Sequence, residues 1–132
     1  MIGINDVWRQ FDHINLLEQI DPERFESTYR ELLEQTRCHL RGLTLMTPFY
    51  LETYTEDPMR KLMDFYGQIV KRLASDYDAE FVDTQCFFNR HLSHRPTQSI
   101  CGDRVHPNQA GHMIIAKAFL HSIDFDWGRT LK

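Results

Sequence analysis

The chain has 132 residues, of which 42% are hydrophobic and 26% charged, and its net charge is −4 with histidine neutral. These values are typical of one globular domain over residues 1–132 and argue against the strongly basic surface of a nucleic-acid-binding protein. No apolar run approaches the ~18 residues of a membrane span, and the opening MIGINDVWRQ lacks the pattern of a signal peptide.

The cysteines and histidines predict neither a disulfide framework nor a metal site. Cys38, Cys86 and Cys101 show no CxxC spacing, which favours three reduced thiols in a cytoplasmic protein. The seven histidines form no HExxH or Cys/His pattern. We therefore expect no metal ion and no organic cofactor.

The first third of the chain predicts two strands with a helix between them. Residues 1–4, MIGI, indicate a buried strand that is cut part-way, because such strands usually have about five or six residues. An amphipathic helix is expected over residues 22–41, with Asp21 as its N-cap and Gly42 as its stop. The apolar run LTLM, residues 43–46, predicts the second strand.

The remaining chain repeats this order. Asp57 caps a helix predicted over residues 58–77, AEFVD at 79–83 predicts a third strand, and a shorter helix is expected over 84–92. The last helix begins at Pro107 and is apolar on most sides, so it should be well packed. Alternating strands and helices predict an α/β fold, a three-layer sandwich with a parallel sheet and helices on both faces. Sites in such sheets lie beyond the carboxyl ends of the strands.

Asp103 and His106 carry the first chemical signal. A histidine base works best with an acceptor that fixes its tautomer, and a spacing of three in a turn can place a carboxylate beside one ring nitrogen. A helix-capping Asp in a surface turn explains the same pattern without chemistry. Asn5 also has two interpretations. Its amide can stabilise an oxyanion at a strand end, or it can bond its own backbone in a turn.

Taken together, GIND near the N-terminus and DRVHPNQAGH near the C-terminus resemble the SGNH or GDSL hydrolase family. That family is named after a nucleophilic Ser, a Gly, an Asn and a His, with the Asn in a G-x-N-D block and the His in a D-x-x-H-P block. Longer stretches such as LMTPFYLE and DRVHPNQAGHMIIAKAFL are similar to the intracellular carbohydrate acetylesterase (acetylxylan esterase) branch.

The resemblance implies a role for each matched residue. His106 would be the general base, Asp103 would orient it, Asn5 would donate to the oxyanion, and Gly3 would shape the strand end. No cofactor is implied, and the substrate would be an acetylated carbohydrate or small ester.

The neighbours of these residues bear on the substrate pocket. Trp8 and Arg9 follow Asn5 and would form part of an acyl or sugar pocket, although Trp8 fits a packed position under that loop equally well. Gly102 stands where some relatives have a bulky aromatic residue. Phe49 fits a sugar site or, more readily, the core.

The nucleophile is not evident within this sequence. The family carries its serine in a G-D-S block ahead of the Asn block, and here the five serines lie outside G-D-S and G-x-S-x-G patterns. Cys101 is the alternative nucleophile, but a buried loop thiol is the better interpretation. We expect these 132 residues to be the C-terminal two-thirds of the domain, without its first two βα units, with an exposed sheet edge and no activity alone.

The sequence leaves two functions open. The first is a serine carboxylic-ester hydrolase that removes acyl groups from a carbohydrate. The alternative is a non-catalytic remnant that acts as a binding or oligomerisation module, including as a homo-oligomer.

Overall fold

The computed structural model describes residues 1–12, 19–126 and 128. It contains five α-helices and two β-strands within those residues, together with the 3₁₀ turns η1 (Arg37–His39) and η2 (Thr97–Ser99). The helices and strands are α1 (Ile4–Asp12), α2 (Pro22–Thr36), β1 (Thr44–Met46), α3 (Pro58–Asp76), β2 (Glu80–Val82), α4 (Thr84–Leu92) and α5 (Gln109–Ser122).

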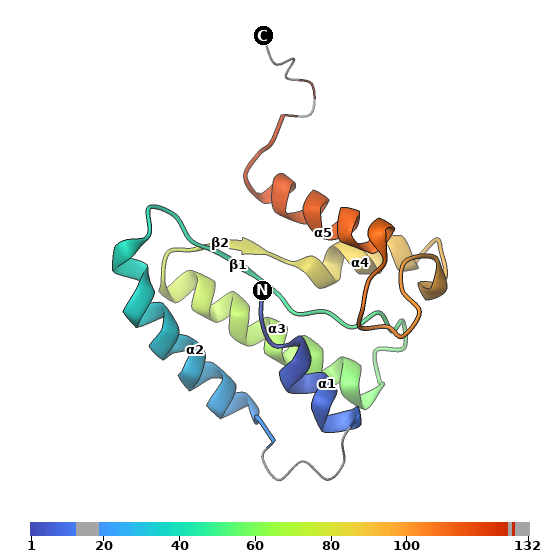
Figure 1. Ribbon diagram of the computed structural model, residues 1–132, viewed down its shortest axis with the longest axis horizontal. Coiled ribbons are helices and arrows are strands. Elements are labelled where there is room, and N and C mark those ends of the chain that lie inside the picture. Colours follow the sequence, from blue (N-terminus) through green and yellow to red (C-terminus); the bar gives the residue numbers. More distant parts are fainter. Residues whose placement is uncertain (13–18, 127, 129–132) are drawn as a thin grey trace.

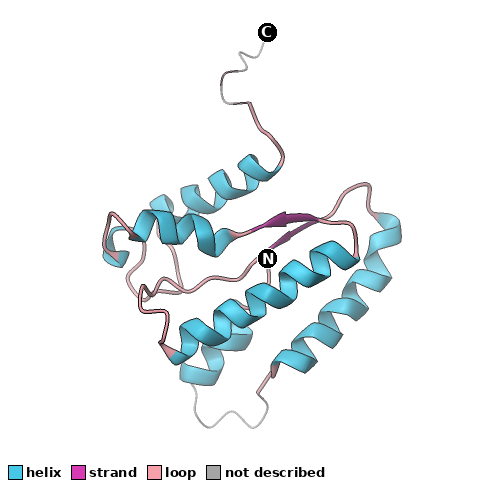
Figure 2. Ribbon diagram, turned by 180° about the vertical axis from the view of Figure 1, so that it is seen from behind, coloured by secondary structure: helices cyan, strands magenta, loops and turns pink. Residues whose placement is uncertain are grey.

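The two strands form a small parallel sheet between two layers of helices. Leu45 of β1 is opposite Phe81 of β2. Helix α3 packs on both strands and is itself in contact with α1 and α2, whereas α5 packs on β2 and α4 (Figure 1). The view from behind shows α3 and α2 in front of the strands (Figure 2). The predicted α/β fold with a parallel sheet is confirmed.

Short polar side chains fix where the helices begin. Asp21 accepts a hydrogen bond from the backbone N–H of Arg24 at 2.7 Å, and Asp57 accepts one from Arg60 at 2.9 Å. Asn108 caps α5 in the same way by accepting from the N–H groups of Ala110 and Gly111. These bonds satisfy backbone donors that have no partner within the helix.

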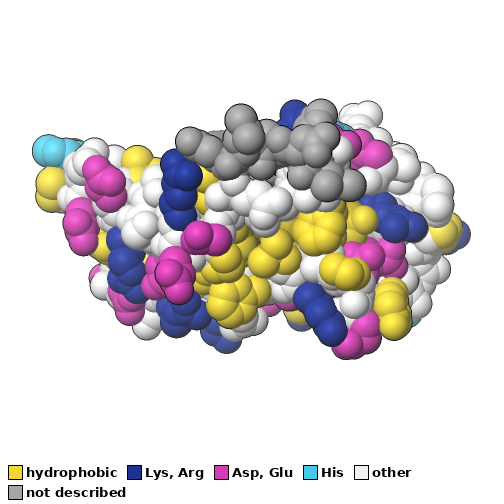
Figure 3. Space-filling view, turned by 90° about the horizontal axis from the view of Figure 1, so that it is seen from below, with side chains coloured by type: hydrophobic (Ala, Val, Ile, Leu, Met, Phe, Trp, Pro, Cys, Tyr) yellow, Lys and Arg dark blue, Asp and Glu magenta, His cyan; other side chains and the backbone are white. Residues whose placement is uncertain are grey.

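Two apolar clusters hold the layers together. The first joins α1, α2, α3 and β1, and its fully buried side chains include Met63, Tyr66 and Leu73. The second lies under α5 and contains Phe49, Leu51, Phe88 and Ile100. Phe49 is only 1% exposed, which confirms its predicted place in the core. Seen from below, hydrophobic side chains also gather near the middle of the surface, with charged side chains around them (Figure 3).

The strand predicted for residues 1–4 is wrong. Residues 1–3 lie outside regular structure and α1 begins at Ile4, so Asn5 belongs to the first turn of a helix. Gly3 has a φ of +111°, which takes the chain out of the extended conformation, and its carbonyl accepts from the N–H of Val7 at 3.1 Å. These two features start a helix where apolar residues alone suggested a strand.

The predicted extents of two helices also need correction. Helix α2 ends at Thr36, where the threonine hydroxyl donates to the carbonyl of Leu32, and η1 follows instead of a helix up to residue 41. Helix α5 begins at Gln109 and is not well packed: of its residues only Gly111 and Ala118 are buried. Among the described helices and strands, α5 makes its main contacts with α4 and β2, so one side of it stays exposed.

Gly111 and Gly102 provide a matched pair for testing whether the close packing at the start of α5 contributes to stability. A Cβ at Gly111 would lie 2.6 Å from Cβ of Pro107 and 2.9 Å from the carbonyl oxygen of Ile100, whereas a Cβ at Gly102 would meet nothing within 4 Å. We expect Gly111→Ala to lower the free energy of unfolding by about 1–3 kcal/mol, despite the better helix propensity of alanine. Gly102→Ala should stay within about 0.5 kcal/mol. Urea unfolding of both variants checks this, and equal stability would contradict it.

Candidate active site

Asp103 and His106 form a hydrogen-bonded pair in a turn just ahead of α5. Oδ2 of Asp103 lies 2.6 Å from Nδ1 of His106, and Oδ1 accepts from the backbone N–H groups of Val105 at 3.0 Å and His106 at 2.8 Å. Arg104 has a φ of +69°, the left-handed conformation that lets the turn close so tightly. One carboxylate therefore holds both the backbone of the turn and the imidazole.

The electrostatics of this pair keep the carboxylate ionised. The backbone N–H of His106, its ring and the N–H of Val105 hold the pKa of Asp103 well below its usual value. An ionised Asp103 accepts the Nδ1 proton of His106, which leaves Nε2 as the ring nitrogen that can take up a proton. Both side chains are more than half exposed, at 53% and 63%, so the pair is open to an incoming group.

Cys101 supports the same turn from beneath, a role that its sequence pattern did not indicate. It is 1% exposed, and its thiol donates to Oδ1 of Asp103 at 3.3 Å and to the carbonyl of His106 at 3.1 Å. Burial raises the pKa of the thiol, so the nucleophilic thiolate is disfavoured. Its place in the structure agrees with the predicted buried loop thiol.

A hollow of about 480 Å³ joins the N-terminus to the His106 turn. Gly3, Asn5, Val105 and His106 are among the residues that line it. Asn5 lies in the first turn of α1 and is exposed to this hollow, while Gly3 is buried beside it. A Cβ at Gly3 would lie 3.3 Å from the ring of Phe25 and from Pro48, so this position needs a glycine for space as well as for its φ. The structure thus brings Gly3, Asn5 and His106 together.

Trp8 and Arg9 of α1 lie next to the residues that line the hollow. The Trp8 ring stands edge-on to the His106 ring, with 5.1 Å between ring centroids and 85° between planes. The Arg9 guanidinium lies 4.5 Å above the Trp8 ring and also pairs with Asp12 at 3.4 Å. Trp8 therefore packs directly on the histidine, whereas Arg9 reaches it only through Trp8. Gly102 is exposed, and a Cβ there would meet nothing within 4 Å.

The loop over residues 48–52 links the His106 turn to the rest of the fold. Gln85 of α4 accepts from the N–H of Tyr50 at 2.7 Å and donates to its carbonyl at 3.2 Å. The next residue, Leu51, donates its N–H to the carbonyl of Arg104 at 3.0 Å, and Glu52 pairs with the Arg104 guanidinium at 2.8 Å. The sequence did not reveal this support because its partners lie far apart along the chain.

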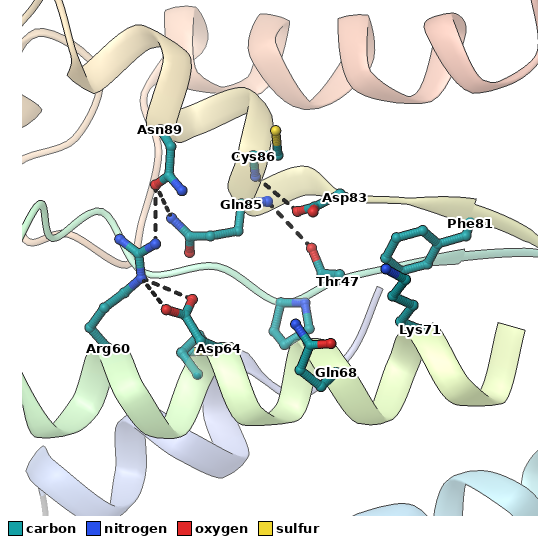
Figure 4. A pocket seen from close by; sticks show the side chains of 13 residues that line it. Thr47, Arg60, Asp64, Gln68, Lys71, Phe81, Asp83, Gln85, Cys86 and Asn89 are labelled. Atoms are coloured by element: carbon teal, nitrogen blue, oxygen red, sulfur yellow. Dashed lines mark hydrogen bonds and ion pairs between the residues drawn. The ribbon is translucent and has the colours of Figure 1, made fainter. Parts of the chain in front are cut away.

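Arg60 of α3 holds the other end of that loop (Figure 4). Its side chain is 4% exposed, contacts both carboxylate oxygens of Asp64, and donates to the carbonyl of Glu52 and to Oδ1 of Asn89. Asn89 in turn accepts from Gln85 at 2.9 Å. A polar pocket of about 360 Å³ lies between α3 and α4 beside this network. Asp103 and His106 do not line it.

Other kinds of site find no support within residues 1–12, 19–126 and 128. No group of three or more His, Cys, Asp or Glu side chains is placed to hold a metal ion there. No helix in that part of the chain is long and apolar enough to cross a membrane.

The fold is α/β, and Asp103 and His106 form a carboxylate–imidazole pair at the edge of the hollow. The chain belongs to the GDSL-like lipase/acylhydrolase family, whose model matches residues 1–114. It is 47% identical over 131 residues to an acetylxylan esterase of Geobacillus stearothermophilus, a match that covers 98% of this chain and 60% of the relative. The predicted family and its acetylxylan esterase branch are thereby confirmed.

Comparison with solved structures also finds relatives of this chain. A crystal structure of an acetylxylan esterase from Geobacillus stearothermophilus matches with a TM-score of 0.95 and 47% identity, covering 99% of this chain and 60% of the other. An alpha/beta hydrolase enzyme from the metagenome of Lake Arreo, Spain, matches with a TM-score of 0.92 and 43% identity, covering 95% of this chain and 58% of the other. The chain thus spans about 60% of the length of the relatives it matches.

Some of the solved relatives are catalytic mutants. In the Geobacillus esterase a serine, an aspartate or a histidine is replaced by alanine in separate structures. The aspartate and the histidine are three residues apart there, as Asp103 and His106 are here. The serine precedes that aspartate by more residues than this chain contains.

Proposed function

We propose that these 132 residues supply the base and oxyanion half of a serine carboxylic-ester hydrolase that removes acetyl groups from a carbohydrate. The observation that carries the proposal is the 2.6 Å contact between Asp103 and Nδ1 of His106, which leaves Nε2 available on a residue that lines the same hollow as Asn5. The names of the relatives support an acetylated xylan or xylo-oligosaccharide as the substrate class.

His106 acts first as base and then as acid. Its Nε2 takes the proton of a serine hydroxyl while the serine oxygen attacks the acetyl carbonyl carbon. Asp103 stabilises the imidazolium that forms, and the Asn5 amide donates to the carbonyl oxygen as it becomes negative. The imidazolium then protonates the departing sugar oxygen. His106 next activates a water molecule, which releases acetate from the acyl-serine.

The proposal places the nucleophilic serine outside these 132 residues. Four serine hydroxyls donate to the backbone carbonyl three residues earlier: Ser27, Ser93, Ser99 and Ser122. Ser99 also lies 3.1 Å from Nε2 of His91, but with its proton on the Pro96 carbonyl it can only accept from that ring. No serine lines the hollow beside His106. The position of the serine in the Geobacillus esterase supports the same conclusion.

Two proteins, the chain alone and a fusion, test the proposal. The 132-residue chain alone should release p-nitrophenol from p-nitrophenyl acetate no faster than its His106→Ala variant. Joining it to the part of the Geobacillus esterase that carries the catalytic serine should give turnover that depends on His106. His106-dependent turnover by the chain alone would place the nucleophile within it. A folded but inactive fusion would favour the non-catalytic module instead.

A further inference from the structure

We propose that the polar pocket between α3 and α4 is a second, non-catalytic site, which binds a short stretch of the same carbohydrate that the proposed function deacetylates. The inference rests on the proposed function for the identity of the sugar, but not for the site itself. The pocket has a volume of about 360 Å³, which is within the usual range for small-molecule sites. Asn5, Asp103 and His106 do not line it, so a ligand there would lie apart from the proposed chemistry.

One face of α3 forms a wall of this pocket. Four polar side chains follow one another there at spacings of four, four and three residues: Arg60, Asp64, Gln68 and Lys71. Such spacings place the four in one row along the helix. The row spans about 16 Å, because each helical residue rises about 1.5 Å. Figure 4 shows Arg60 at one end of the pocket and Lys71 at the other, so the wall suits an elongated ligand.

Gly67 leaves the middle of this wall open. It is buried within α3, where glycine lowers helix stability relative to alanine. Its φ is not positive, and a Cβ there would lie 3.7 Å from Cγ2 of Thr47, which is an ordinary contact distance. Neither the backbone conformation nor the packing therefore requires glycine. The pocket provides a reason for it, because a side chain at this position would fill space between α3 and β1.

The Arg60 end of the pocket is held by its own hydrogen bonds. Arg60 pairs with Asp64 at 2.9 Å and donates to Oδ1 of Asn89 at 3.2 Å. Gln85, which is 7% exposed, also donates to Asn89 and accepts from the N–H of Tyr50. The charges at this end are thus compensated within the protein, and the wall is in place before a ligand arrives.

The other end presents groups without such partners. Gln68 and Lys71 are exposed, and neither makes a side-chain hydrogen bond or ion pair with another residue that the structure describes. Asp83 lies across the pocket at the start of α4, where it accepts from the N–H of Cys86. The ring of Phe81 is partly exposed beside Lys71 (Figure 4). An ammonium, a carboxylate, an amide and an aromatic ring therefore meet at this end.

These groups favour a neutral ligand with many hydroxyls. An anion would meet Lys71 but also the carboxylates of Asp64 and Asp83, and no described cluster of three or more His, Cys, Asp or Glu side chains is placed to hold a metal ion. A hydroxyl both donates and accepts, so it can satisfy an ammonium, a carboxylate and an amide alike. The apolar face of a sugar ring can pack on an aromatic side chain. A saccharide therefore uses all four kinds of group.

Pro48 places the pocket next to the hollow that contains His106. It lines the pocket, and its Cγ lies 3.3 Å from the position that a Cβ at Gly3 would take. Gly3 lines the hollow together with Asn5 and His106. The two spaces are thus neighbours across one proline. A polymeric substrate held in the pocket would therefore remain close to the hollow.

The test measures binding of unacetylated xylotriose to the complete 132-residue chain. This ligand has no ester, so binding is observed without any reaction. In a titration followed by nuclear magnetic resonance of the isotope-labelled chain, we expect saturable shifts of the backbone amides of Gln68, Lys71 and Phe81. The same shifts should occur in the His106→Ala variant, because His106 lies outside the pocket.

Two lysine variants on α3 locate the site. Lys71→Ala should weaken xylotriose binding about tenfold, because the ligand loses a hydrogen bond to a charged group. Lys61→Ala is the matched control, since Lys61 is also exposed but pairs with Glu56 and does not line the pocket. Its affinity should stay within about a factor of two of the unaltered chain, as expected for a surface position. Thermal unfolding of each variant checks that the chain still folds.

The outcomes separate the pocket from the catalytic function. Absence of saturable shifts, or no difference between the two lysine variants, would overturn the second site. Shifts confined to Asn5 and His106 would place the sugar in the hollow and overturn it as well. Binding of the free amino acid alanine in place of xylotriose would overturn the saccharide in favour of a zwitterion. Xylotriose binding at the pocket by a chain whose fusion shows no turnover would support the site and overturn the proposed esterase.

Discussion

In the fusion that supplies a serine, His106→Ala is expected to lower kcat by at least about 10⁴-fold. Alanine removes the only group that can take the serine proton in this geometry. Asp103→Asn should cost about the same, because an amide facing Nδ1 donates a proton there and forces the wrong tautomer of His106. Asn5→Ala should cost less, roughly 10²–10³-fold, as expected for one oxyanion donor. Steady-state turnover of p-nitrophenyl acetate measures all three.

The histidine control for this series is His91→Ala. His91 is half-buried and touches Ser99, and it lies outside the hollow that contains His106. Its replacement should leave kcat unchanged within about a factor of two. A loss as large as that of His106→Ala would show that the 91–99 pair carries the chemistry, and our assignment of the base would be wrong.

Arg60→Leu is expected to lower the free energy of unfolding by about 1–3 kcal/mol, because buried hydrogen-bond acceptors lose their donor. The guanidinium is buried and serves three partners, so its loss removes the donor to the Glu52 carbonyl, one of two donors to Oδ1 of Asn89, and the cation beside Asp64. The loop over residues 48–52 loses the anchor at its Glu52 end. In the fusion the same change should also reduce kcat, because Leu51 holds Arg104 in the His106 turn.

Arg72→Leu on the same helix is the matched control for this change. Its guanidinium pairs with Glu26 at 2.7 Å, but the arginine side chain is 51% exposed, and such surface pairs contribute about 0–1 kcal/mol. Urea unfolding followed by circular dichroism compares the two variants. Similar small losses for both would mean that the Arg60 network contributes little to holding the loop.

Sequence reasoning succeeded where the interactions are local. The N-caps Asp21 and Asp57 and the pairing of Asp103 with His106 all span three residues, so the spacing itself brings the groups together. The pattern at Asn5 was also informative about its location near His106, although it suggested a strand end where the structure has a helix start.

The features that were missed depend on distant partners or on what packs against each element. Gln85 and Tyr50 are 35 residues apart, so no spacing pattern could reveal that they support the His106 turn. Helix α5 was expected to be well packed because apolar residues surround it, yet burial depends on what lies against each side. The strand predicted at residues 1–4 failed for a different reason, since the positive φ of Gly3 and a helix start determine the backbone there.

The compactness of the Asp103–His106 turn has a consequence for the order of assembly. The hydrogen bonds to the imidazole and to its carboxylate come from residues 101–106, while Trp8 and Leu51 add contacts to the turn from outside that segment. Under the proposed function, a serine that reaches the hollow would therefore meet a histidine whose Nδ1 already lies 2.6 Å from its carboxylate partner.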